Sequence, residues 1–179
     1  SYMAYNEQST KWLAVANQGT TAQTSTDGVT WSQVTLPITS GWGGVAYGAG
    51  YFVIVPNGSA TTALYSNSNG LSWKQSTMPS GSGWSEVVYG NGRFVSIATT
   101  TNKAAYSTTY GSTWTSATLP SSQSWTNLAY GNGKYVAIST GGNTITPTAA
   151  TGSAGTVTLT FNLQSSAPFV VGQTIVVSG

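Results

Sequence analysis

The chain has 179 residues, and only 4% are charged: five basic and three acidic residues give a formal net charge of +2 at pH 7. It has no cysteine and no histidine, which excludes disulfide bonds, thiolate metal sites and a serine–histidine catalytic pair. The few scattered cations form no basic patch, so nucleic acid is not an expected partner. Seven tryptophans and ten tyrosines supply the apolar area for a core.

The sequence contains no recognisable membrane or leader segment. No apolar run approaches the roughly 20 residues that a membrane helix needs, so no membrane insertion is expected. The chain begins Ser-Tyr-Met-Ala-Tyr, without an initiator methionine, a basic segment or an apolar leader. We therefore expect it to be an internal piece of a longer protein.

Short apolar runs bounded by turn residues predict strands from the first residues onward. In residues 2–37 the predicted strands are residues 2–5, 12–16, 20–24 and 30–35. Residues 42–79 give four more, at residues 42–47, 51–55, 63–66 and 72–77. Pro79 is expected to end the last of these, because proline has no N–H to give to a ladder.

Glycine turns join the first two strands of each later unit. Gly48-Ala-Gly50 has this place in the second unit, and Gly90-Asn-Gly92 and Gly131-Asn-Gly133 have it further along the chain. Asn-Gly between apolar runs favours a type I′ turn, in which both central residues have positive φ. Each of these strand pairs is therefore predicted to be a hairpin.

The units are copies of one repeat. Five landmarks recur at steps of 42 and 41 residues: Gly28, Gly70 and Gly111; Trp31, Trp73 and Trp114; Pro37, Pro79 and Pro120; Trp42, Trp84 and Trp125; and Tyr47, Tyr89 and Tyr130. A period of about 40–45 residues built from short strands is typical of propeller blades. The predicted fold is all-β, with about 3.5 tandem four-stranded antiparallel propeller-type blades in residues 1–140: residues 2–37, 42–79, 84–120 and a partial copy at 125–139.

From residue 141 the repeat stops and the composition changes. Residues 144–148, 156–163 and 173–177 are predicted strands, separated by Gly/Ser/Ala-rich and Ala-Pro turns. We expect residues 141–179 to form a second, non-propeller β module that is cut short at Gly179.

The segment before each of the first landmark tryptophans resembles the Asp-box of sialidase-like propellers, Ser-x-Asp-x-Gly-x-Thr-Trp. The three copies are Thr24–Trp31, Ser66–Trp73 and Ser107–Trp114. Hydroxyl residues replace the Asp of the box, namely Thr26, Ser68 and Thr109, and Asp27 follows one residue later. The resemblance implies that the box glycines and tryptophans stabilise the turn between the third and fourth strands. The other landmark tryptophans, Trp42, Trp84 and Trp125, are expected in the core between blades.

Two resemblances point to a phage. The phrase Tyr-Gly-Asn-Gly-(Lys/Arg)-(Phe/Tyr)-Val, followed by Tyr-Ser and Gly-x-(Ser/Thr)-Trp, resembles repeats of tailed-phage tail fibres and adhesins. The run from Ala167 to Gly179 resembles a β module of marine and cyanobacterial phage structural proteins. They imply a structural, adhesive protein on the surface of a virion, with other virion proteins or copies of itself as partners. Three and a half blades cannot close a ring, so the missing strands must come from further parts of the same polypeptide, from residues 142–179, or from neighbouring copies. Of these a homo-oligomer is preferred, by resemblance to phage fibres a trimer.

The residues argue against catalysis. A glycosidase needs two flanking carboxyl groups, but Glu7, Asp27 and Glu86 lie at unrelated places in their units. Sialidases also need an arginine triad, and Arg93 is the single arginine. Clustered metal ligands and a phosphate-binding loop are lacking, so no metal or cofactor is expected. Two alternatives stay open: a glycan-binding propeller module of a bacterial surface protein, and a degenerate sialidase-like hydrolase.

Ligand binding is expected in loops that vary between copies of a fixed framework. In a four-stranded blade, the loop after the second strand and the connection to the next blade share one face. These loops are residues 38–41, 56–62, 80–83, 99–103 and 121–124. Their polar side chains are the candidate binding residues: Asn57, Ser59, Ser82, Asn102 and Lys103. Amide and hydroxyl groups bond to sugar hydroxyls, which makes a host-surface glycan a candidate ligand.

Overall fold

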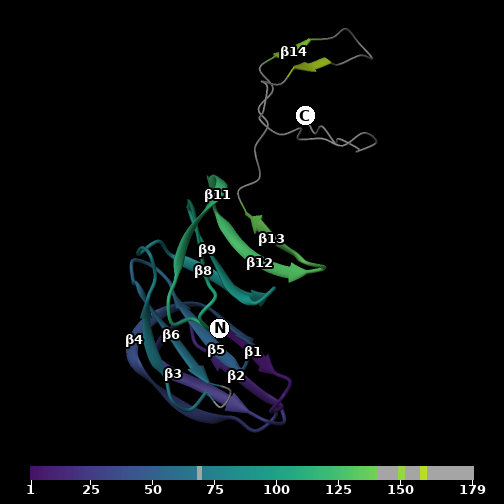
Figure 1. Ribbon diagram of the computed structural model, residues 1–179. Coiled ribbons are helices and arrows are strands. Elements are labelled where there is room, and N and C mark those ends of the chain that lie inside the picture. Colours follow the sequence, from purple (N-terminus) through teal and green to yellow (C-terminus); the bar gives the residue numbers. More distant parts are fainter. Residues whose placement is uncertain (68–69, 141–148, 152–157, 161–179) are drawn as a thin grey trace. The chain divides into compact units, whose positions relative to one another are not determined.

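The computed structural model describes residues 1–67, 70–140, 149–151 and 158–160, and every regular element in these ranges is a β-strand (Figure 1). The chain divides into two compact units, residues 1–141 and residues 142–179. The first unit contains all copies of the repeat. In the described ranges, no helix has the length and apolar character to cross a membrane.

The N-terminal half of the chain forms one seven-stranded antiparallel sheet, in which strands adjacent in sequence are adjacent in space. Its strands are β1 (Tyr2–Asn6), β2 (Lys11–Val15), β3 (Gln18–Ser25), β4 (Ser32–Gly48), β5 (Tyr51–Pro56), β6 (Thr62–Asn67) and β7 (Lys74–Thr77). The 17-residue strand β4 pairs with β3 in its first part and with β5 in its second part. The sheet is therefore two four-stranded blades joined through one strand.

The third blade is a separate four-stranded antiparallel sheet with the order β11-β10-β9-β8. Its strands are β8 (Trp84–Gly90), β9 (Arg93–Ala98), β10 (Thr101–Ser107) and β11 (Thr115–Gln123). The partial fourth copy is the hairpin of β12 (Trp125–Gly131) and β13 (Lys134–Ser139). In Figure 1 this hairpin and the third blade lie on the same side of the seven-stranded sheet. The predicted all-β fold of antiparallel four-stranded blades is confirmed.

Two connections that we predicted as loops are largely strand. Residues 38–41 lie inside β4, and their last two residues pair with the start of β3. Strand β11 likewise continues to Gln123, which pairs with Thr101. Pro37 and Pro120 do not end these strands, because each lies where the pairing register shifts. At such an irregularity the missing N–H of proline interrupts no ladder bond.

The three glycine turns have the predicted type I′ conformation. Both central residues have positive φ in each turn: 48° and 85° at Ala49 and Gly50, 43° and 74° at Asn91 and Gly92, and 48° and 77° at Asn132 and Gly133. This conformation matches the right-handed twist of the flanking strands, so the turns set the register of each hairpin.

Ala49 occupies the position at which the later copies have Asn. The left-handed conformation costs a residue with a Cβ roughly 1–2 kcal/mol, and Asn tolerates it better than Ala. We therefore expect Ala49→Asn to raise the free energy of unfolding by about 0.5–1 kcal/mol, measured by urea titration. The reverse substitutions Asn91→Ala and Asn132→Ala should lower it by a similar amount. Unchanged unfolding midpoints in all three variants would contradict this account.

Each blade packs on the next through a cluster of buried apolar side chains. Between the first and second blades, the cluster includes Leu13, Val15, Trp42, Phe52 and Ile54. Between the second and third, it includes Val53, Val55, Trp84, Val87 and Phe94. A smaller cluster of Ile97, Ala104 and Leu128 joins the third blade to the hairpin. Successive residues of β5 thus face opposite neighbours, which explains the continuous apolar run of that strand.

Neighbouring blades also meet where a tyrosine ring covers a glycine. A Cβ added to Gly48 would lie 2.0 Å from Cγ of Tyr89, and one added to Gly90 would lie 2.2 Å from Cγ of Tyr130. In both places the ring of one blade lies directly on the backbone of the blade before it. We call Gly48 and Gly90 seat glycines. Each follows a landmark tyrosine in the sequence, so one repeat carries both a ring and a seat.

A methyl group on a seat glycine would displace the base of the tyrosine ring, which is the least movable part of that side chain. We expect Gly48→Ala and Gly90→Ala each to destabilise the protein by about 1–3 kcal/mol, the usual cost of overpacking. Gly131→Ala is the matched control at protein concentrations low enough to keep the chain monomeric, because no described atom of the same chain lies within 4 Å of a Cβ at that position. Thermal unfolding tests this, and equal melting temperatures for the three variants would refute the role of the seats.

The second unit contains one described strand pair. Strands β14 (Ala149–Thr151) and β15 (Thr158–Thr160) pair antiparallel. The strand predicted at residues 156–163 is observed over its middle. The pairing of Ala149–Thr151, which we placed in a turn region, was not predicted. The strands predicted at residues 144–148 and 173–177 lie outside the described residues.

Candidate functional site

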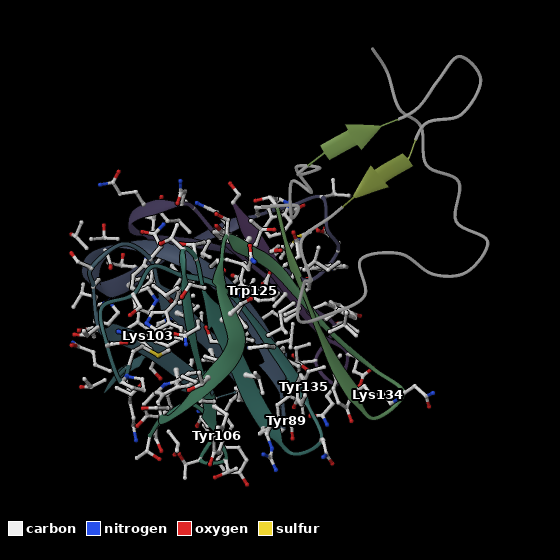
Figure 2. All side chains as sticks on the ribbon, turned by 90° about the horizontal axis from the view of Figure 1, so that it is seen from above. Tyr89, Lys103, Tyr106, Trp125, Lys134 and Tyr135 are labelled. Carbon is white, nitrogen blue, oxygen red and sulfur yellow. The ribbon has the colours of Figure 1, made fainter. Side chains whose placement is uncertain are left out.

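The two ends of the blades differ in what they carry. The glycine turns lie at one end, and the β5–β6 and β9–β10 connections lie at the other, together with the links between blades. We call the second end the loop end. Figure 2 shows Lys103 well away from Tyr89 and Tyr106, which lie toward the turn end. The candidate binding residues are found toward the loop end.

A hollow of about 480 Å³ opens at the loop end. It is lined by Gly58, Ser59, Gly81, Ser82, Gly83, Thr99, Thr100, Thr101 and Lys103. We call it the loop-end hollow. Ser59 comes from the second blade, Ser82 from the link between blades, and Lys103 from the third blade. The structure therefore brings three of the five candidate residues together.

The walls of the loop-end hollow are tied to each other by backbone contacts. Gly83 N–H donates to the carbonyl oxygen of Gly58 at 2.6 Å, and Thr99 N–H donates to the carbonyl of Gly83 at 2.9 Å. A Cβ on Gly81 would lie 2.2 Å from the carbonyl oxygen of Ser59, so these loops are in direct contact. The hollow thus presents hydroxyl groups and one ammonium group on a preformed surface.

Asn102 and Lys103 are strand residues and not the loop residues that we predicted. Strand β10 begins at Thr101, and both side chains are exposed on it. They line a second hollow of about 330 Å³ beside Pro79 and Trp84. Lys103 therefore borders both hollows, and Asn102 borders only the second one.

The side chain of Asn57, which we predicted as a binding residue, makes contacts between blades. Its Nδ2 donates to the carbonyl oxygen of Trp42 at 3.3 Å and to Oδ1 of Asn17 at 3.0 Å. Its side chain also fills the space beside Gly41, where a Cβ would lie 2.1 Å from Asn57 Oδ1. Asn57 joins the first two blades and lines none of the hollows described here.

The second blade carries an aromatic hollow of about 290 Å³ that was not predicted. Its lining includes Tyr51, Tyr65, Asn67, Trp73 and Lys74. The indole N–H of Trp73 is buried without a hydrogen-bond partner. Aromatic faces, an amide and an ammonium group are the groups that sugar-binding sites use. Tyr51 and Tyr65 were the sequence signal for this hollow. We assigned Trp73 only to the turn, because a tryptophan recurs at that position in every repeat.

The third blade fills the equivalent place with its own side chains. Arg93 and Tyr106 occupy the positions that Tyr51 and Tyr65 have in the second blade. The guanidinium carbon of Arg93 lies 5.4 Å from the ring centroid of Tyr106, within the range of a cation–π contact. The first blade has a hollow of about 200 Å³ at the equivalent place, but polar side chains such as Lys11 and Thr24 line it, so the aromatic lining belongs to the second blade.

The landmark tryptophans between blades are core residues. Trp42 and Trp84 are buried, and their indole N–H groups donate to the carbonyl oxygens of Gly19 and Ser80. Trp125 is half-buried and donates to the carbonyl of Ser121 in the same way. Of the box tryptophans, Trp73 and Trp114 pack against the blade clusters, whereas Trp31 is 37% exposed. Their box glycines Gly28, Gly70 and Gly111 all have positive φ, between 64° and 87°.

Side-chain oxygens cap the turn between the third and fourth strands. In the first blade, Ser25 Oγ accepts from the N–H of Gly28 at 2.8 Å. Asp27 Oδ1 accepts from Val29 N–H at 2.9 Å and from Thr30 N–H at 2.7 Å. The capping residues of this turn are therefore Ser25 and Asp27. The box pattern places Thr24 and Thr26 at its Ser and Asp positions, each one residue before the side chain that caps the turn, Ser25 and Asp27 respectively.

A neutral residue caps the same turn in the third blade. Ser107 Oγ accepts from Gly111 N–H at 2.9 Å, and Thr109 Oγ1 accepts from Thr113 N–H at 3.0 Å. Thr109 thus does for this turn what Asp27 does for the first. The first blade has one residue fewer between the capping side chain and the box glycine, which explains the offset of one residue.

The hydrogen bonds from the backbone N–H groups of Thr30 and Val29 hold the pKa of Asp27 well below its usual range, and the bond from the Ser25 hydroxyl makes a smaller contribution. A lowered folded-state pKa means that the carboxylate stabilises the fold above the unfolded-state pKa of about 4, and that this contribution is lost as the pH falls below it. We expect Asp27→Asn, which keeps an oxygen acceptor, to melt below the wild type at pH 7. The gap should narrow as the pH falls from about 5 towards 2.

Asp27→Ala is the control for this measurement, because it removes the acceptor at every pH and should melt below the wild type throughout. A gap between Asp27→Asn and wild type that stays constant with pH would show that the charge of Asp27 contributes nothing to the turn.

The three carboxyl groups belong to different elements. Glu7 is exposed between β1 and β2, Asp27 caps a turn, and Glu86 is half-buried in β8, where burial raises its pKa. None of them lines the hollows described above. Within residues 1–67, 70–140, 149–151 and 158–160, no group of three or more potential metal ligands occurs. The hollows therefore offer neutral polar groups, aromatic rings and lysines.

No protein-family model and no curated protein sequence matches this chain. Solved structures do match. YCF48 bound to D1 peptide has a TM-score of 0.58 and 14% identity, over 72% of this chain and 43% of that one. YCF48 from Cyanidioschyzon merolae has a TM-score of 0.56 and 14% identity, over 90% and 58%. The GH74 enzyme of Niastella koreensis has a TM-score of 0.48 and 24% identity, over 65% and 17%.

The likeness to the two YCF48 structures shows the fold. Both neighbours are β-propellers, and the chain is accordingly built of propeller-type blades. This chain spans 43% and 58% of the length of those two chains. At 14% identity the likeness is one of architecture alone.

Proposed function

We propose that this chain is a non-enzymatic structural and adhesive module of a phage virion, and that it contacts a host-surface glycan through the loop-end hollow. The observation that carries the adhesive part is the meeting of Ser59, Ser82 and Lys103 in one hollow. The segments that carry them differ between copies, whereas the landmark residues of the blades recur. The virion part rests on the resemblance of the repeat and of residues 167–179 to phage proteins.

The chemistry of the loop-end hollow suits a saccharide. Five hydroxyl residues besides Lys103 line it, namely Ser59, Ser82, Thr99, Thr100 and Thr101, and glycines leave their backbone open. Hydroxyl groups both donate and accept, as sugar hydroxyls do, and one ammonium group favours an acidic or phosphorylated sugar. The preformed backbone lowers the entropic cost of binding.

A non-enzymatic role is supported by the placement of the carboxyl groups. Glycoside hydrolysis needs two carboxyl groups roughly 5–10 Å apart on either side of the bond. In this chain Asp27 is committed to a turn and Glu86 lies between blades. The hollows carry no carboxyl group of their own.

The aromatic hollow supports a second candidate function. In this alternative the chain is a glycan-binding module of a bacterial surface protein. Tyr65 and Trp73 line this hollow and offer aromatic faces on which a sugar can stack. Immunogold labelling with antibodies against this chain separates the two candidate functions. Labelled phage particles support the virion proposal, and labelled bacterial surfaces contradict it.

Binding to immobilised lipopolysaccharides and capsular polysaccharides from candidate host bacteria tests the adhesive site. We expect Lys103→Ala combined with Ser82→Ala to weaken binding at least tenfold. Lys134→Ala is the matched control, since this lysine lies at the tip of the β12–β13 hairpin (Figure 2) and lines none of the hollows. Loss of binding in Tyr65→Ala and not in the double variant would move the site to the aromatic hollow. No binding to any polysaccharide would contradict adhesion.

A further inference from the structure

The last hairpin exposes an apolar face that the other blades bury. Val136 and Ile138 on β13 are 56% and 58% exposed. Their equivalents in the second blade, at the same distance after the landmark tyrosine, are Val53 and Val55. These two are completely buried against the third blade. The outer face of the β12–β13 hairpin, which we call the tail face, is thus half of a blade-to-blade contact.

Gly131 adds an open seat to the tail face. It follows Tyr130 as Gly48 follows Tyr47 and as Gly90 follows Tyr89. Tyrosine rings cover Gly48 and Gly90, whereas no described atom lies within 4 Å of a Cβ built on Gly131. The tail face therefore offers apolar side chains and a seat of the size that a tyrosine ring fills in the two preceding blades.

The first blade exposes the other half of this contact. Tyr5 has the place of the landmark tyrosine, and its ring packs on Trp12 with centroids 4.4 Å apart, as Tyr89 packs on Phe94 at 4.9 Å. Tyr5 is 41% exposed, whereas the ring of Tyr89 lies on Gly48 of the second blade. Met3 is 56% exposed, whereas Val87, its equivalent in the third blade, is 1% exposed. We call the outer face of β1 and β2 the head face.

We propose that copies of this chain associate head to tail, with the head face of one copy packed on the tail face of the next and the ring of Tyr5 seated on Gly131. The occupant is a second copy because the chain itself carries both halves of the contact. The equivalents of both halves already pack on each other between its second and third blades. Neither Met3 nor Val136 is charged, so the contact buries no charge at these positions.

The expected assembly is a closed dimer. A head-to-tail contact is heterologous, so it repeats until a ring closes or a fibre grows. Closed propellers have roughly four to eight blades. Two copies bring together six four-stranded blades and two hairpins, whereas three copies would exceed that range. The geometry of the blades thus favours two copies over the trimer that resemblance to phage fibres implies.

Sedimentation velocity of the full chain over a range of concentrations tests the association. We expect twice the 18.4 kDa mass of one chain, with dissociation on dilution. Gly131→Leu, which fills the seat, and Met3→Glu should each be monomeric and should melt as the wild type does when it is diluted to monomer. Val29→Glu is the control, because that side chain is 83% exposed at a turn outside both faces. A wild-type monomer at every concentration overturns the proposal, as does a dimer that both face variants leave intact.

Complementary charges test which faces meet. Val53 and Val87, the equivalents of Val136 and Met3, belong to one buried cluster. Val136→Lys and Met3→Glu should therefore fail to associate alone and should associate when mixed in equal amounts. Two folded variants that remain monomeric in the mixture would overturn the pairing of these two faces.

Thiol labelling separates a second copy from residues 142–179 as the cover of the tail face. The chain has no cysteine, so Val136→Cys introduces a single thiol. A maleimide should label it slowly in the dimer, and at least tenfold faster when Gly131→Leu is also present. A thiol that stays protected in a monomer would mean that the chain covers its own tail face, which overturns the proposal.

Discussion

The stack of blades depends on one contact. The first strands of neighbouring blades approach each other closely, and a tyrosine ring of one blade lies on a seat glycine of the other. A Cβ at Gly43 would lie 1.7 Å from the carbonyl oxygen of Trp84, so the second and third blades meet almost backbone to backbone. The third blade has Ser85 at that position, and its hydroxyl donates to the carbonyl of Trp125 at 3.0 Å. Ring and seat lie on opposite faces of each blade, which gives the stack a direction.

Local chemistry made most of the fold predictable. The apolar run Tyr51–Val55 and the alternating strands around it depend on residues next to one another in sequence. The Asn-Gly pairs specify their own backbone angles, and the observed φ values at Asn91 and Asn132 follow. The missed continuity of β4 has another origin. Whether Pro37 ends a strand depends on the register of a distant partner, β3, and composition does not reveal that register.

The candidate site was harder to predict because its residues are joined by the packing of blades. Ser59, Ser82 and Lys103 lie on separate segments, and they were chosen because these segments vary between copies. Asn57 also lies in a loop that varies between copies, but its side-chain amide forms hydrogen bonds that join the first two blades. Trp73 was not predicted to line a hollow, because a tryptophan follows the turn at the same position in every copy. Polar loop residues with structural and with binding roles look alike until their partners are known.

Strand β4 runs without a break from the outer edge of the first blade to the inner edge of the second. The third blade, by contrast, follows the second through the irregular segment 78–83. In most repeat proteins each unit contributes its own term to stability, with a further term for each interface. Here the first two blades share backbone, so neither can open without breaking the ladder of the other. Their amide protons should therefore exchange as one cooperative unit, distinct from those of the third blade.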